Sequence, residues 1–183
     1  MLFRSGDRKS APGTARTVAI DMNNDLALLE VQPGGPTPAK SFRVANPSKL
    51  ETAMKVYAIG HPRGVPWAFT EGVVSALIPD YDYMYDDGVK RHAVRVILTQ
   101  TPIDPGNSGG ALLDAEGELV GVTSMGRPKD RIATVAIACD PIASFIEAGM
   151  RGESPPPPRE AADRKSTRLN SSHIPLSRMP SSA

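Results

Sequence analysis

Residues 100–110 read Gln100-Thr101-Pro102-Ile103-Asp104-Pro105-Gly106-Asn107-Ser108-Gly109-Gly110. Glycines stand on both sides of the serine in this stretch, Ser108. A serine nucleophile needs an exposed hydroxyl and nearby backbone N–H groups that can hold a developing oxyanion. Glycines permit the unusual backbone angles of such a loop and keep side chains away from a substrate carbonyl. Taken alone, the stretch also fits a turn between two strands.

Residues 106–110 match the G-x-S-x-G nucleophile elbow of α/β-hydrolases as well. An elbow requires a helix directly after the serine, with an acid and a histidine later in the chain. Here a hairpin pattern follows over residues 111–124, and the one histidine after Ser108 is His173, near the end of the chain. We therefore reject the elbow.

Short apolar runs rich in Val, Ile, Leu and Thr surround the serine stretch, with turn residues between them. They predict strands over residues 17–21, 26–31, 55–59, 67–77, 94–100, 111–113, 119–124 and 134–138. One helix is predicted over residues 141–149, with Asp140 as its N-cap and Pro141 at its first position. This pattern predicts an all-β barrel or sandwich.

The composition bounds the function. The chain has 183 residues, of which 40% are hydrophobic and 22% charged, so it can bury a core. A net charge of +1 gives no case for nucleic acid or acidic membranes as partners. No apolar run approaches the roughly 18 residues of a membrane span, and the N-terminus lacks the pattern of a secretory signal.

Nothing in the sequence indicates a metal or a cofactor. A single cysteine, Cys139, excludes an internal disulfide and a cysteine-based metal cage. Residues 80–88 are rich in acids, but Met84 and Tyr85 stand where a calcium loop needs a ligand and a glycine. We expect these residues to form a solvated acidic hairpin loop.

The composition changes at residue 151. Residues 151–183 are rich in Pro, Ser and Arg and contain no aromatic residue. They offer little apolar surface to offset the entropy of ordering, so we expect a disordered tail. From Asp163 onward the tail resembles a read-through peptide found on unrelated assembled sequences, and we assign it no function.

A second candidate for chemistry lies in the stretch Asn24-Asp25-Leu26-Ala27-Leu28-Leu29. Asp25 stands at the mouth of a predicted strand, where an acid can orient an imidazole and stabilise its charged form. An aspartate at this place equally fits a turn that begins a strand.

Five stretches together resemble the trypsin-like serine peptidases of the HtrA/Deg type. Besides the two above, they are Val56-Tyr57-Ala58-Ile59-Gly60-His61-Pro62-Arg63-Gly64, Thr70-Glu71-Gly72-Val73-Val74-Ser75-Ala76 and Gly117-Glu118-Leu119-Val120-Gly121-Val122. All five stand in the family's order, over residues 1–148, which makes the resemblance more specific than any one motif.

The resemblance implies a chymotrypsin-like fold of two six-stranded β-barrels with the active site between them. It implies an incomplete first barrel over residues 1–45 and a second barrel over residues 46–150 that ends in a helix. It also implies Ser108 as nucleophile and Asp25 as the acid that orients a histidine. The oxyanion hole would lie at Gly106, Asn107 and Ser108, with the N–H groups of Gly106 and Ser108 as donors.

The sequence departs from the family at the general base. The family's histidine precedes the aspartate, and residues 1–24 contain no histidine. His61 stands at a variable position of a Gly- and Pro-bounded loop, and His92 is expected in an exposed connection, so neither takes that role. Residues 2–7 are similar to the strand and turn that follow the family's histidine. We therefore expect the chain to begin within the first barrel and to be inactive as given.

The resemblance also carries expectations about substrates. Family members that cut after Lys or Arg keep an acid six residues before the serine, where this chain has Pro102. Ile103 matches the residue that shapes the primary pocket in HtrA-like enzymes, which implies small or medium aliphatic side chains. Ile103 fits an ordinary core position equally well. By family analogy the substrates are polypeptides, and the protein is expected to be exported or to lie at the cell envelope. The same analogy leaves open whether it forms a homo-oligomer.

Two functions therefore stand against each other. The first is a serine endopeptidase that hydrolyses polypeptides through an acyl-enzyme, without metal or cofactor. The alternative is a pseudo-peptidase that lost its histidine and binds or scaffolds peptides. The intact Ser108 loop and Asp25 weigh against a long-standing loss, because a pseudo-peptidase has no chemical need for either.

Overall fold

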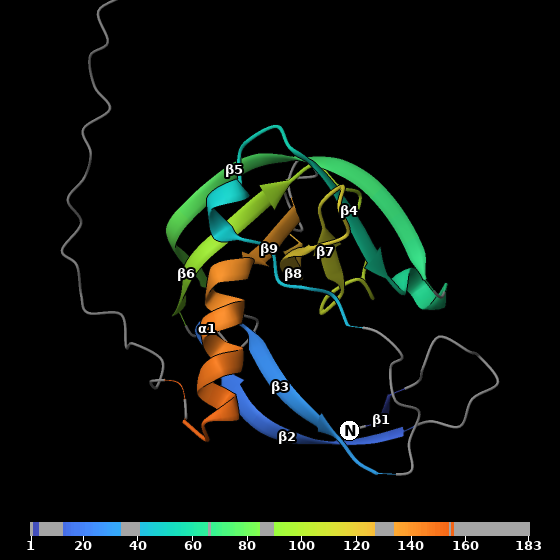
Figure 1. Cartoon of the computed structure of the whole chain (residues 1–183). Coiled ribbons are helices and arrows are strands. Elements are labelled where there is room, and N and C mark those ends of the chain that lie inside the picture. Colours follow the sequence, from blue (N-terminus) through green and yellow to red (C-terminus); the bar gives the residue numbers. More distant parts are fainter. Residues whose placement is uncertain are drawn as a thin grey trace, which may run out of the picture.

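The computed structural model describes residues 2–3, 13–33, 41–65, 67–84, 90–126, 134–153 and 155. These residues form a small sheet, a barrel and a helix, α1 (Cys139–Met150), that packs against both (Figure 1). The small sheet is antiparallel and has the order β1 (Leu2–Phe3), β2 (Gly13–Asp21) and β3 (Leu26–Val31).

The barrel is a closed ring of six antiparallel strands in the order β4-β5-β6-β9-β8-β7. The strands are β4 (Lys55–Gly60), β5 (Ala68–Met84), β6 (Lys90–Thr99), β7 (Ala111–Leu113), β8 (Leu119–Gly126) and β9 (Thr134–Ala138). β7 pairs back with β4, where Ala111 lies opposite Ile59. Closure satisfies the backbone groups that an open sheet would leave at its edges.

β9 shows how the barrel is packed on both sides. All five of its residues are buried. Ala136 and Ala138 belong to one hydrophobic cluster, together with Val56 of β4 and Leu112 of β7. Val135 and Ile137 belong to a second cluster. Because side chains alternate between the faces of a strand, β9 contributes to both clusters at once.

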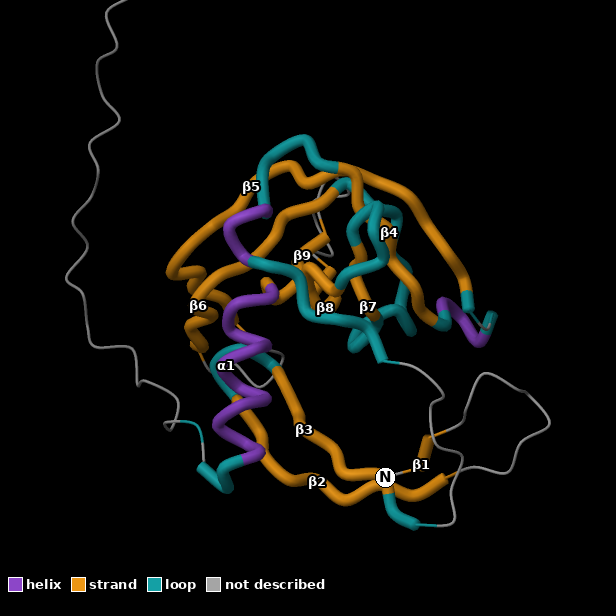
Figure 2. Tube along the Cα trace, in the orientation of Figure 1, coloured by secondary structure: helices purple, strands orange, loops and turns teal. Residues whose placement is uncertain are grey.

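The second cluster joins the small sheet to the barrel. It contains Leu26 of β3, Val96 of β6, and Ile142 and Phe145 of α1. Gly149 lies so close to β3 that a Cβ there would stand 2.4 Å from Leu28 Cδ2. The end of α1 therefore rests directly on the small sheet, as the tube in Figure 2 shows.

The connection between the two parts follows β8 for a short distance. Leu119 N–H donates to the Arg43 carbonyl at 2.7 Å, and Ala45 N–H donates to the Leu119 carbonyl at 2.9 Å. A 3₁₀ turn at Pro47–Lys49 then leads to β4, and a second one at Pro62–Gly64 follows it. The predicted boundary at residues 45 and 46 falls within this connection and stays a prediction.

Within the described residues, the all-β class, the six-stranded barrel and the one α-helix that follows it are confirmed. Strands 26–31, 111–113 and 134–138 have the predicted bounds. None of the helices in the described residues has the length and apolar character needed to cross a membrane. The predicted tail lies outside the described residues except for 151–153 and 155.

Two local predictions are wrong. β5 continues to Met84 and β6 begins at Lys90, so His92 lies within a strand, opposite Asp82, and not in a connection. These parts of the two strands are rich in polar residues, so they contain no apolar run from which a strand could be predicted. The helix begins at Cys139 with Ala138 as its N-cap, and Asp140 lies in its first turn.

Cys139 gives a direct test of this packing. Its side chain is fully buried, and it forms no disulfide. Burial raises the pKa of the Cys139 thiol, and the neighbouring Asp140 carboxylate raises it further. We predict that an aromatic disulfide reagent at mildly alkaline pH modifies Cys139 at least 100-fold (an order-of-magnitude figure, ~10²) more slowly in the native protein than in urea. Equal rates in the two conditions would show that this part of the core is open.

Candidate active site

The loop that carries Ser108 connects β6 to β7 and is held by β8. Gly109 N–H donates to the Thr123 carbonyl at 2.6 Å, and Thr123 N–H donates to the Gly110 carbonyl at 2.9 Å. The Thr123 hydroxyl donates to the carbonyl of Asn107. Asn107 is buried, whereas Ser108 is exposed. The loop therefore presents its serine on a backbone that neighbouring strands fix in place.

Gly106 is required by a close approach of two loops. Its φ is +106°, and a Cβ at this position would lie 2.4 Å from the His61 carbonyl oxygen. His61 N–H donates to the Gly106 carbonyl at 3.3 Å, and Arg63 N–H donates to the Pro105 carbonyl at 3.1 Å. Any side chain at residue 106 would push these two loops apart.

Ser108 and Asp25 both hydrogen-bond to Ser124 of β8. The Ser108 hydroxyl donates to the Ser124 carbonyl at 2.9 Å. The Ser124 hydroxyl donates to Asp25 Oδ2 at 2.5 Å. The structure thus brings together two residues that lie more than 80 positions apart in the sequence. Ser124 could not be identified from the sequence, because no motif marks it.

Asp25 stands at the end of a turn that Asp21 organises. The N–H groups of Asn23 and Asn24 donate to Asp21 Oδ1 at 2.9 and 3.1 Å. Asn24 Nδ2 donates to Asp21 Oδ2 at 2.7 Å. Asp25 itself has a φ of +52°, a left-handed conformation that Asp adopts more readily than most residues.

The same turn is anchored on the barrel. Val94 N–H of β6 donates to Asn24 Oδ1 at 3.0 Å, and the Tyr83 hydroxyl of β5 donates to the Asn23 carbonyl at 2.9 Å. The position of Asp25 therefore depends on contacts between the small sheet and the barrel. The contacts of Asn24 and Tyr83 were not identified from the sequence, because their partners, Val94 and Asn23, lie far away in the chain. The bonds of Asp21 are local, and an aspartate two and three residues before two asparagines is a pattern that could have indicated the turn.

Two backbone donors face no acceptor. In the part of the chain that the structure describes, neither Gly106 N–H nor Ser108 N–H has a hydrogen-bond partner. By contrast, the N–H groups of Asn107, Gly109 and Gly110 are all bonded within the protein. The loop thus leaves one N–H at the serine and one two residues before it.

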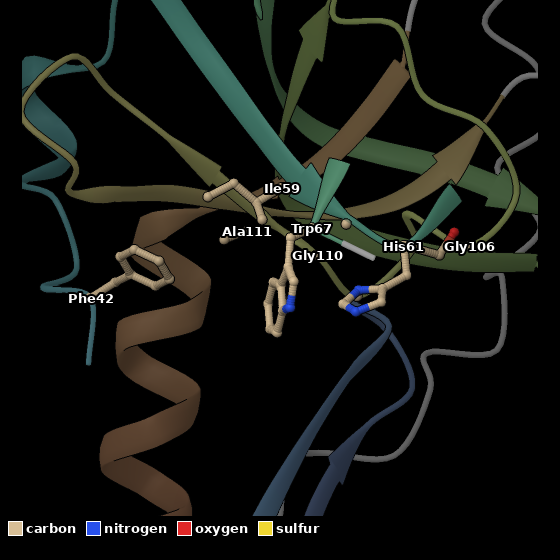
Figure 3. Close-up of a pocket in the computed structure, with 10 residues that line it drawn as sticks. Phe42, Ile59, His61, Trp67, Gly106, Gly110 and Ala111 are labelled. Atoms are coloured by element: carbon tan, nitrogen blue, oxygen red, sulfur yellow. The ribbon is translucent and has the colours of Figure 1, made fainter. Parts of the chain in front are cut away.

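A pocket of about 420 Å³ opens beside Ser108 (Figure 3). Its lining combines the serine and nearby glycines with larger, mostly apolar side chains: Ser108, Gly60, Gly106, Gly109 and Gly110, with Phe42, Ile59, His61, Trp67 and Ala111. The His61 ring packs edge-on against Trp67, with ring centroids 4.7 Å apart. Ile103 does not line this pocket but packs against the first hydrophobic cluster. Its assignment to the primary pocket stays a prediction.

The two described histidines make their contacts away from the Asp25 carboxylate. His92 lies between two carboxylates, with Nδ1 2.7 Å from Asp82 Oδ1 and Nε2 3.2 Å from Asp80 Oδ1. Within the described residues, neither His61 nor His92 hydrogen-bonds to Asp25 or Ser108. No three His, Cys, Asp or Glu side chains of this part of the chain come together as metal ligands would.

Comparisons with known proteins agree with this geometry. A family described as the trypsin-like peptidase domain matches residues 2–122. The chain is 36% identical over 114 residues to serine protease Do-like HtrB of Bacillus subtilis (strain 168), which covers 61% of this chain and 24% of that protein. It is 34% identical over 127 residues to a probable periplasmic serine endoprotease DegP-like of Pseudomonas fluorescens, covering 68% of this chain and 24% of the relative.

A solved structure is similar as well. The HtrA-type protease AlgW with decapeptide matches with a TM-score of 0.66 and 26% identity, over 80% of this chain and 43% of that one. The chain spans about a quarter of the length of the curated relatives it matches.

The anchoring of the Asp25 turn predicts a difference between two adjacent asparagines. Asn24→Ala removes two side-chain bonds and leaves Val94 N–H without its acceptor, so we expect it to lower the free energy of unfolding by about 1–3 kcal/mol. Asn23→Ala is the matched control, since Asn23 Oδ1 is buried without a partner and its loss should cost little. Urea unfolding measures both, and equal losses would contradict the anchoring role.

The close approach at Gly106 predicts a second difference. Gly106 and Gly109 both have positive φ, but only a Cβ at Gly106 would meet other atoms within 4 Å. We expect Gly106→Ala to destabilise the protein by at least about 1 kcal/mol more than Gly109→Ala, because both carry backbone strain and only the first adds a clash. Denaturant midpoints compare the two. A larger loss for Gly109→Ala would show that the two loops are not packed as described.

Proposed function

Because the chain belongs to the trypsin-like peptidases of the HtrA type, we propose that Ser108 is the nucleophile of a serine endopeptidase that hydrolyses polypeptides through an acyl-enzyme. Asp25 is the acid that orients and stabilises a histidine. The connection from Ser108 through Ser124 to Asp25 is the observation that supports both roles. In this reaction the Ser108 oxygen bonds to the substrate carbonyl carbon while an imidazole takes its proton, and the scissile C–N bond then breaks as the imidazole gives that proton to the leaving amine. Water hydrolyses the resulting acyl-enzyme and restores the serine.

The N–H groups of Gly106 and Ser108 form the oxyanion hole in this proposal. Two converging backbone donors stabilise the negative charge that develops on the carbonyl oxygen. Asn107 lies between them and is buried, so it holds the loop and leaves the donors exposed. The absence of an internal acceptor for either donor within the described residues supports this role.

The general base is neither His61 nor His92. Both nitrogens of His92 face carboxylates, and the His61 ring packs against Trp67. A serine hydroxyl without a base is a weak nucleophile at neutral pH. We therefore propose that the chain as given has little activity, and that an imidazole placed between Ser108 and Asp25 would complete the triad.

A second candidate function is a peptide-binding pseudo-peptidase. The observation that favours it is that neither described histidine bonds to Asp25. Under this alternative the pocket and the loop bind polypeptides, and Ser108 has no chemical role. Both candidates share the same class of ligand, and the reactivity of Ser108 separates them.

The similar proteins support proposals about the ligand and the location of this protein. The similar AlgW structure is described with a decapeptide, which supports a polypeptide ligand here. The Pseudomonas relative is described as probably periplasmic, which supports an exported or cell-envelope location. We further propose that β1–β3 are part of a first barrel, that β4–β9 are the second, and that Ile103 shapes the primary pocket.

Chemical rescue tests the proposed roles on the chain itself. We predict that a fluorophosphonate probe labels Ser108 slowly, and that added imidazole accelerates labelling about tenfold, well below the roughly 10²–10⁴ of a positioned base. Ser108→Ala should abolish labelling. Asp25→Asn should remove the acceleration, because the amide no longer stabilises an imidazolium. Labelled protein is measured by mass spectrometry, which also identifies the modified residue.

Three outcomes would overturn parts of this assignment. Equal labelling of Ser108→Ala would place the nucleophile elsewhere. No labelling at any imidazole concentration would favour the pseudo-peptidase. Fast labelling without imidazole that His61→Ala abolishes would make His61 the base and contradict the proposal that neither described histidine has this role.

A further inference from the structure

The pocket beside Ser108 has an apolar wall that no proposed catalytic step uses. Phe42 and Trp67 are large apolar side chains on this wall, yet they are 52% and 51% exposed. Ile59 of β4 and Ala111 of β7 lie side by side at its base, since the two residues are paired across the strands. Exposed apolar groups that surround a hollow mark a binding site more often than scattered surface residues do.

We propose that this pocket binds one bulky apolar side chain, such as Leu, Met or Phe, of the polypeptide bound at Ser108, and that Phe42 and Trp67 set this preference. The pocket is a subsite separate from the position of Ile103, which packs into the hydrophobic core and does not line it. This inference rests on the proposed function, because it names the substrate residue that lies next to the bond attacked by Ser108.

The position of the pocket next to Ser108 favours a side chain of the substrate as its ligand. Gly106, Ser108, Gly109 and Gly110 all line it, so a polypeptide whose carbonyl lies at the Ser108 hydroxyl has this pocket next to the bond that is attacked. The volume of about 420 Å³ lies near the lower end of the range of ligand pockets, roughly 300–1,000 Å³, and suits a side chain better than a large cofactor.

The residues that line the pocket disfavour a charged substrate side chain. His61 is the only titratable side chain among the residues that line the pocket in the described part of the chain. A Lys, Arg, Asp or Glu side chain placed there would lose water without gaining a charged partner, which is costly. An apolar side chain gains from the same burial in proportion to the area it removes from water.

Trp67 is held in place at a cost to its backbone. Its φ is +57°, a left-handed conformation that is unusual for a bulky residue. Its ring packs against the ring of His61, and the backbone N–H of His61 donates to the Gly106 carbonyl in the loop that carries Ser108. Strained residues of this kind persist where the surrounding structure determines them, and they gather at ligand sites. The contact with His61 therefore places the Trp67 ring next to the loop that carries Ser108.

The single tryptophan of the sequence makes the test direct. The full chain with Ser108→Ala, which excludes turnover, is titrated with blocked pentapeptides of alanine whose central residue is Leu, Ser or Glu. We expect the Leu peptide to shift Trp67 emission to shorter wavelength in a saturable manner, because its side chain displaces water from the ring. The Leu peptide should bind about tenfold more tightly than the Ser or Glu peptide.

Two exposed phenylalanines provide matched variants. Phe42→Ser removes part of the wall and should reduce Leu binding to the level of the Ser peptide. Phe69→Ser is the control, because Phe69 is 60% exposed, stacks on Tyr57 and does not line the pocket. Its Leu affinity should match that of the parent protein. Because both positions are exposed, neither variant is expected to impair folding.

The outcomes separate this inference from the proposed function. Equal affinity for Leu and Ser peptides, or an equal loss with Phe42→Ser and Phe69→Ser, overturns the subsite. Fluorophosphonate labelling of Ser108 without Leu-selective binding overturns the subsite alone. Leu-selective binding that Phe42→Ser removes, in a protein whose Ser108 is not labelled, supports the subsite and overturns only the enzymatic role.

Discussion

The hydrogen bonds between the Ser108 loop and β8 are the constraint on which the site depends. Thr123 exchanges backbone bonds with Gly109 and Gly110 and adds a hydroxyl bond to the Asn107 carbonyl. The next residue, Ser124, then meets both the Ser108 hydroxyl and the Asp25 carboxylate. One strand of the barrel thus sets the position of the serine and of the acid, and an error in the β7–β8 register would displace both.

The Asp25 carboxylate lies next to β8 because two kinds of contact hold the small sheet against the barrel. Leu26 of β3 is buried in a cluster with α1 and β6, which fixes the sheet as a body. Tyr83 and Val94 bond to the turn that precedes Asp25, which fixes the turn itself. Apolar burial gives most of the attraction and has no direction, whereas the hydrogen bonds define where the carboxylate stands.

The sequence allowed the local part of this arrangement to be predicted. Apolar runs between turn residues located most strands, and the glycines around Ser108 marked the loop. Ser124 and Asn24 could not be found, since their partners lie 99 and 70 positions away and no local pattern encodes such bonds. His92 was misplaced because its hairpin is polar on its exposed side. Trp67 was interpreted from the sequence as rim or core packing, and the pocket that it lines could not be predicted, since residues from separate segments of the chain form it.

The way the loop is held separates its geometry from its chemistry. The donors at Gly106 and Ser108 are oriented by backbone bonds and by a glycine that no other residue can replace without a clash. None of these bonds involves an imidazole, so the loop needs no general base to keep its shape. A preorganised donor pair stabilises a developing oxyanion without reorganising during the reaction. In the proposed function, stabilisation of the developing charge would therefore be a property of the barrel, whereas activation of the serine would depend on an imidazole that contacts Asp25.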